Sequence, residues 1–213
     1  MSDISGLNQW LTSTDSVVSD CERMAEKIKE EKQRIRDALQ QLESQSADVK
    51  AALDSVTAEI NNLVDQMNDD DADPSTIQTL QSRVSMLQSQ RSQMMALMSQ
   101  LEQRKMNERE KQKKLEQNTE KLRGYCHRAI ASFGKKIDDC QQMIGRLQTA
   151  SGMASNIATM RFGNSAQQLG RNTDSRVQQY QNVIQRCVSQ RWRMEQVLNS
   201  LDDGEAYVRE RTR

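Results

Sequence analysis

Residues 60–84 read INNLVDQMNDDDADPSTIQTLQSRV, and this stretch decides the fold. Apolar side chains recur three and four positions apart on both sides of an acidic run that contains Pro74, the only proline of the chain. Asp73 can cap a helix that begins at Pro74, where the missing N–H costs nothing. The stretch therefore predicts one helix end, a turn over residues 68–75 and a second helix start.

The same periodicity extends along both predicted helices. Before the turn, positions seven apart read Cys21, Ile28, Ile35, Leu42, Val49, Val56 and Leu63, with companions from Val18 to Met67. After the turn, the same seven-residue frame runs without a change of phase from Ile77 and Leu80 to Leu147. A sustained heptad predicts a coiled coil, and a short connection makes the two helices antiparallel. The predicted fold is all-α, with a long antiparallel coiled-coil hairpin.

Two registers of this hairpin fit the turn. If paired residue numbers sum to about 140, the polar seam residues Lys32 and Glu108 face each other. If they sum to about 147, Glu108 faces Leu39 instead. We prefer the first register, because a carboxylate against Leu loses hydration without gaining a partner. Lys32 and Glu108 are therefore the predicted register pair.

The second predicted helix outruns the first, so Phe133 and Leu147 need another covering element. A third helix over about residues 172–201 would fold back and form a three-helix bundle at one end of the hairpin. The predicted organisation is an N-terminal segment on the bundle (1–15), the hairpin (16–122), the bundle end (123–201, with a small-residue connector at 151–170) and a polar C-terminal tail (202–213). Whether the first helix is continuous through residues 12–16 stays open.

The composition limits the function classes. The 213 residues are 35% hydrophobic and only 3% aromatic, and the formal net charge is zero. Such a chain lacks the apolar content of an ordinary enzyme core and has no stretch long enough to span a membrane. No cleavable secretion signal is recognisable, so we expect a cytoplasmic protein with reduced cysteines, although secretion without such a signal stays open.

No motif predicts catalysis, cofactor binding or a metal site. Cys126 and His127 are adjacent, but neighbouring residues on a helix point about 100° apart and cannot form a nucleophile and base pair. The alternating aspartates of residues 69–73 resemble the start of a calcium loop. That loop would need Gly where Pro74 stands and Glu where Leu80 stands. We expect a non-enzymatic protein without a cofactor.

Charge is distributed unevenly along the hairpin. Residues 27–36 carry five basic and two acidic side chains, and residues 104–114 carry six and two. In the preferred register these stretches lie together as a basic band that could dock an acidic partner, while Asp65, Asp69, Asp70, Asp71 and Asp73 make the tip acidic. The alternative is that the charges only keep the hairpin soluble. The candidate interaction residues are Lys27, Lys29, Arg34, Arg36, Arg104, Arg109, Lys111, Lys113 and Lys114, with the off-seam methionines Met95 and Met106.

These features favour a coiled-coil scaffold or adaptor that acts through helix–helix contact with a protein partner or another copy. The seam is weakest where Lys105, Glu108 and Gln112 interrupt it. A membrane-surface protein, similar in outline to hairpins that coat bilayers, and a helical substrate or helper of a bacterial secretion system are the alternatives. No aromatic residue lies between positions 11 and 124, which argues against base stacking on single-stranded nucleic acid.

Overall fold

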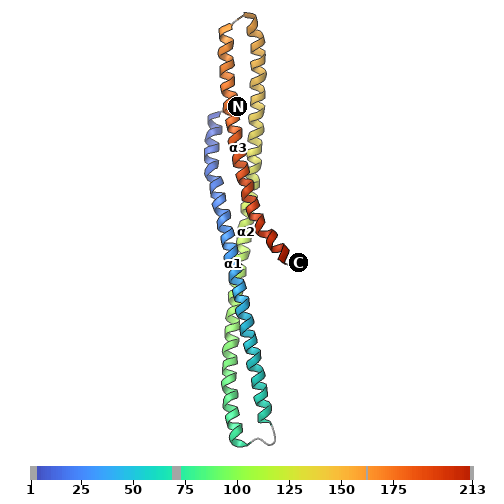
Figure 1. Ribbon diagram of the computed structural model, residues 1–213. Coiled ribbons are helices and arrows are strands. Elements are labelled where there is room, and N and C mark those ends of the chain that lie inside the picture. Colours follow the sequence, from blue (N-terminus) through green and yellow to red (C-terminus); the bar gives the residue numbers. More distant parts are fainter. Residues whose placement is uncertain (1–3, 69–72, 162, 212–213) are drawn as a thin grey trace. The chain divides into compact units, whose positions relative to one another are not determined.

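The computed structural model describes residues 4–68, 73–161 and 163–211, with side chains described except those of residues 154–170 and 203–211. Three α-helices follow one another: α1 (Ile4–Met67), α2 (Pro74–Arg161) and α3 (Gly163–Arg211) (Figure 1). All the elements in these ranges are helices that pack against one another. The predicted all-α class, with a helical hairpin and a third helix folding back, is confirmed.

Contacts between the helices divide the chain into two units. The bundle unit comprises residues 1–29 and 117–213, and the hairpin unit comprises residues 30–116. The boundaries predicted from the sequence follow residues 15 and 122, whereas the packing assigns residues 16–29 and 117–122 to the bundle unit. Helix α1 runs through residues 12–16 without a break, which settles the question that the sequence left open.

The predicted turn separates α1 from α2. Pro74 is the first residue of α2, as the sequence indicated. The carbonyl of Asp73 accepts the backbone N–H of Ile77 at 3.0 Å, and the Ser75 hydroxyl donates to the Asp73 carboxylate. Asp73 therefore occupies the cap position of α2. Residues 69–72, which hold most of the predicted acidic tip and of the rejected calcium motif, lie outside the described residues.

The hairpin unit is held by the predicted apolar seam. Near the turn its buried core consists of Ile60, Leu63, Val84 and Leu87, against which Val56, Met67 and Leu80 pack. All seven belong to the heptad positions read from the sequence. Full burial of such a side chain stabilises the fold by about 1.5–3 kcal/mol, so the four buried residues make this cluster an apolar anchor of the hairpin unit.

The preferred register is wrong. It would place Ser46 of α1 opposite Met94, but the Ser46 hydroxyl contacts Met98 Sδ at 3.3 Å and Glu102 Oε1 at 3.4 Å. Arg83 of α2 donates to Glu59 of α1 at 2.6 Å, a contact between two long side chains that does not separate the two registers. Helix α2 is therefore displaced along α1 relative to the preferred register, in the direction of the alternative.

The predicted register pair does not form. Among the described side chains no ion pair joins Lys32 to Glu108; Glu108 instead accepts from Lys111 of its own helix at 2.7 Å. The reason that this pair does not form lies within α2 itself. A glutamate on a helix can be satisfied by a lysine three residues later, so it does not require a partner on the facing helix.

In the bundle unit, α3 lies against both α1 and the far part of α2 (Figure 1). The side chains that are almost fully buried come from all three helices: Leu11, Val18, Thr119, Cys126, Phe133, Cys140, Val183, Cys187 and Met194. The Trp10 and Phe133 rings meet edge to face, with centroids 5.4 Å apart. These contacts close the apolar surface of α2 that the sequence left uncovered.

The helix boundaries near α3 differ from the predicted connector. Helix α2 continues to Arg161 and α3 begins at Gly163, whereas the sequence suggested a connector over 151–170 and a helix start near Asn172. Glycine costs a helix only about 1 kcal/mol relative to Ala, and no proline interrupts this stretch, so small residues alone do not end the helices. Similarly, α3 extends to Arg211, through most of the predicted polar tail.

Arg193 connects α3 to α1 in the bundle unit. Its guanidinium donates to both carboxylate oxygens of Glu22, at 2.8 and 2.6 Å, to Asp15 at 3.2 Å and to the Ser19 hydroxyl at 3.0 Å. The hydrogen bonds from Arg193 hold the pKa of Glu22 below its usual range. A bidentate pair of this kind fixes orientation as well as distance, so Arg193 ties α3 to α1 at this level of the bundle unit.

We expect the Glu22 contact to make the bundle unit less stable in acid. A carboxyl whose pKa is lower in the folded state stabilises above its unfolded pKa, and the contribution is lost as the pH falls through the folded value. The melting temperatures of the native protein and Glu22→Gln should therefore differ at neutral pH and converge in acid. Glu26→Gln, one turn along α1, is the control. A difference that stays constant with pH would contradict the assignment.

Candidate functional site

A polar layer crosses the seam of the hairpin unit. The Lys105 ammonium, on a side chain only 11% exposed, contacts Glu102 Oε1 at 2.7 Å, and the same oxygen accepts from Ser46 of α1 at 3.4 Å. The hydrogen bond from Lys105 lowers the pKa of Glu102. This trio, rather than Lys32 and Glu108, is the polar layer that the helices share. The sequence marked Lys105 as an interruption of the seam but could not identify its partners.

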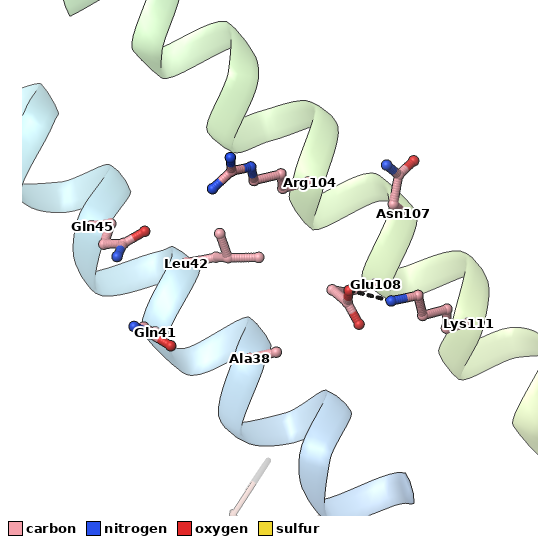
Figure 2. A pocket seen from close by; sticks show the side chains of 8 residues that line it. All are labelled: Ala38, Gln41, Leu42, Gln45, Arg104, Asn107, Glu108 and Lys111. Atoms are coloured by element: carbon pink, nitrogen blue, oxygen red, sulfur yellow. Dashed lines mark hydrogen bonds and ion pairs between the residues drawn. The ribbon is translucent and has the colours of Figure 1, made fainter.

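Next to this layer the seam opens into a hollow. The cavity has a volume of about 370 Å³ and is lined by Ala38, Gln41, Leu42, Gln45, Arg104, Asn107, Glu108 and Lys111. Figure 2 shows Leu42 pointing from α1 toward α2, where Arg104 and Glu108 stand. Ala38 has a short side chain, and all four of the α2 residues that line the cavity are polar or charged.

Opposite charges meet at the rim of the hollow. Glu108, 20% exposed, accepts from the Lys111 ammonium, and this hydrogen bond raises the pKa of Lys111. The charge of nearby Glu31 on α1 acts in the same direction. Arg104 is exposed on the other side of the cavity. The hollow therefore combines an apolar wall at Leu42 with charged groups that water or another side chain can reach.

The structure brings together only some of the predicted interaction residues. Arg104 and Lys111 both line the hollow, whereas Arg109, Lys113 and Lys114 are exposed elsewhere on α2. On α1, Arg34 lies 3.6 Å from Glu31, and Arg36 donates to Gln33 at 3.1 Å. Lys27 and Lys29 are exposed residues of the bundle unit. The predicted band is thus divided between two units.

Exposed methionines are a second feature of α2 in the hairpin unit. Met95 and Met106, which the sequence singled out as off the seam, are more than half exposed. Met86 and Leu97 of the same helix are also exposed, although neither is among the predicted interaction residues. Methionine is flexible and polarisable, so exposed methionines on one helix suit adaptable apolar contacts.

The cysteines and the histidine do not form a reactive group. Cys126 is completely buried and burial raises its pKa to about 12, while the adjacent His127 is exposed. Burial likewise raises the pKa of Cys187 to about 11. A thiol with so high a pKa carries almost no thiolate at neutral pH. Within the ranges that the structure describes, no cluster of three or more ligand side chains could hold a metal ion.

An apolar groove in the bundle unit was not apparent from the sequence. It lies between α1 and α2 and has a volume of about 610 Å³. Cys21, Ile28 and Leu122 form its buried floor, and Met24 and Tyr125 stand at its edge, 53% and 40% exposed. The heptad pattern identifies which side chains face the seam. It does not show where two packed helices leave an open groove beside the seam.

Comparison of the chain with models of protein families, with curated proteins and with solved structures gave no match. Among the described residues, none of the helices combines the length and the apolar character that crossing a bilayer requires.

Proposed function

We propose that this chain is a non-enzymatic coiled-coil adaptor whose hairpin unit binds a helix of a protein partner at the hollow between α1 and α2. The observation that carries the proposal is the hollow itself. Two helices that fit each other along an apolar seam have a cavity of about 370 Å³ where Ala38 and Leu42 face polar side chains of α2. A partner side chain would fill this space and complete the packing.

The chemistry of the rim indicates the kind of partner. Arg104 and Lys111 flank the cavity, and residues 104–114 carry six basic and two acidic side chains. An amphipathic helix with an apolar anchor for the Leu42 wall and acidic residues beside it would match this surface. Such a helix would compete with Glu108 for Lys111, so the existing ion pair supplies a charge already positioned for an acidic ligand.

A photo-crosslinking amino acid at Gln41, which lines the hollow, tests this proposal in cells of the source organism. The matched control carries the same group at Ser44, an exposed position one turn along α1. The captured protein is identified by mass spectrometry, purified and titrated against the full-length chain. We expect capture from Gln41 and not from Ser44.

Charge variants then separate specific docking from general attraction. We expect Arg104→Gln with Lys111→Gln to weaken binding of the identified partner about tenfold, because two rim charges are lost. Lys50→Gln, an exposed basic residue elsewhere in the hairpin unit, should leave binding unchanged. Equal capture from Gln41 and Ser44, or undiminished binding by the double variant, would remove the hollow as the docking site.

A further inference from the structure

The four cysteines of the chain all belong to the bundle unit, and all four are buried free thiols. Each lies in the core of the unit: Cys21 on α1, Cys126 and Cys140 on α2, and Cys187 on α3. A buried cysteine packs like a small apolar residue, so burial alone does not require a second thiol nearby. Here, however, the cysteines lie in two pairs, and each pair joins two different helices.

The first pair joins α1 to α2. The Cys21 and Cys126 thiols interact with each other, and each contributes to the pKa of the other. Tyr125, the residue before Cys126, lines the same groove as Cys21. A disulfide requires two cysteines on adjoining backbone segments whose side chains are directed toward each other. Cys21 and Cys126 meet this requirement across the contact between the two helices.

The second pair joins α2 to α3 and has different surroundings. Burial raises the pKa of Cys187, and the charge of Cys140 contributes in the same direction. Both side chains are almost completely buried, and neither is among the residues that line the groove. Cys21, by contrast, lies on the floor of this open groove of about 610 Å³. The groove therefore gives a small molecule a route to the first pair that does not lead to the second.

We propose that Cys21 and Cys126 form a reversible disulfide that ties α1 to α2 in the bundle unit, with a low-molecular-weight disulfide such as oxidised glutathione as the oxidant. The Cys21 thiolate attacks one sulfur of that disulfide from the groove, which releases one small thiolate and leaves a mixed disulfide on Cys21. The Cys126 thiolate then attacks the Cys21 sulfur and displaces the second small thiolate. Two protein thiols are thereby oxidised, the small disulfide is reduced to two thiols, and the two protons pass to the released sulfurs.

Burial makes this exchange slow. It raises the pKa of Cys21, and it raises the pKa of Cys126 to about 12, so only a small fraction of each is thiolate at neutral pH. The two thiols therefore stay reduced through brief contact with an oxidant and become linked under sustained oxidation. The same burial protects the finished bond, because a reducing thiolate must enter the groove to reach the Cys21 sulfur.

The bond encloses the hairpin unit in a covalent loop, because residues 30–116 lie between Cys21 and Cys126 in the chain. A cross-link that closes a long loop restricts the unfolded chain and so stabilises the folded state. Oxidation therefore strengthens the α1–α2 contact of the bundle unit without altering a side chain of the hairpin unit. Both cysteines lie outside the hollow, so this inference goes beyond the proposed function and does not depend on it.

Peptide mapping of the purified full-length protein tests the inference without any substitution. The protein is equilibrated in glutathione buffers that contain increasing proportions of the disulfide, the remaining thiols are blocked in denaturant, and tryptic peptides are analysed without reduction. Each cysteine falls on its own tryptic peptide, with residues 1–23, 124–128, 137–146 and 187–191. We expect the 1–23 and 124–128 peptides to become one linked species that lacks two hydrogen atoms, before any linkage of the other two peptides appears.

The melting temperature of the bundle unit, followed by tryptophan fluorescence, provides the second measurement. The oxidised native protein should melt roughly 10 °C above the reduced protein, and dithiothreitol should reverse the shift. Cys21→Ser should abolish the linked peptide and the shift, whereas Cys140→Ser, a matched substitution in the second pair, should keep both. Circular dichroism must first show that both variants are as helical as the native protein.

Three results would overturn the proposed disulfide and leave the hairpin proposal untouched. The first is the absence of the linked 1–23 and 124–128 peptides at every glutathione ratio. The second is linkage of Cys140 to Cys187 at a lower proportion of the disulfide than linkage of Cys21 to Cys126. The third is a linked peptide with no rise in the melting temperature, which would show that the bond does not hold α1 against α2.

Discussion

Replacing Phe133 with Ala is expected to destabilise the bundle unit by about 3–5 kcal/mol, because truncating a buried aromatic side chain removes its contacts and leaves a cavity. Phe133 is only 2% exposed, and its ring meets Trp10 of α1 edge to face at 5.4 Å. The substitution therefore removes a contact between α1 and α2 in the core of the bundle unit.

Tryptophan fluorescence measures this effect selectively, because Trp10 and Trp192 both belong to the bundle unit. We expect the fluorescence-detected unfolding midpoint of Phe133→Ala to fall well below that of the native protein. Met153→Ala, which truncates a side chain 63% exposed in the same unit, should change the stability by less than about 0.5 kcal/mol. Similar midpoints for the two variants would show that Phe133 is not a core residue.

Replacing Leu63 with Ala is expected to destabilise the hairpin unit by about 2–5 kcal/mol. Leu63 is 6% exposed and belongs to the cluster with Ile60, Val84 and Leu87 near the turn. A two-helix unit has few other apolar contacts to compensate, since its middle layers contain Ser46 and Lys105. The loss of stability should be near the upper end of this range if the two helices cannot move together to fill the space that the Leu63 side chain leaves.

Circular dichroism, which records both units, is the appropriate measurement for Leu63→Ala. We expect the helical signal to be lost at lower denaturant concentration while the tryptophan transition of the bundle unit moves less. Val64→Ala provides a matched control, because Val64 is the next residue of α1 and is 38% exposed. Equal shifts in the two signals would mean that the hairpin and bundle units unfold together.

The heptad pattern predicted which residues face the seam, but the register that we preferred from the sequence is wrong. Apolar spacing specifies a face of each helix, so Ile60, Leu63 and Leu87 could be assigned to the core before the structure was known. The choice between two registers depended on the partner of Glu108. That partner, Lys111, is on the same helix, and both registers preserve the same apolar seam. Hydrophobic pattern alone could not separate them.

The two candidate sites were predictable to different degrees. Interruptions at Lys105 and Glu108 marked the weak part of the seam, and the hollow does lie there. The groove beside Met24 and Tyr125 had no corresponding signal, because those two residues are distant in sequence and neither breaks a pattern. The exposure of Trp192 was equally hidden, since the sequence does not show which side of α3 the other helices cover.

By itself the sequence determined that the chain is helical, that it reverses at Pro74 and which side chains form the apolar stripe of each helix. These properties depend on residues a few positions apart, and their periodicity is visible in the linear chain. Tertiary structure alone decided the register of α2 on α1, the extent of α3, the partners of Lys105 and Arg193, and the places where the helices leave the hollow and the groove. Those features depend on how side chains distant in sequence fill space together, which no local pattern encodes.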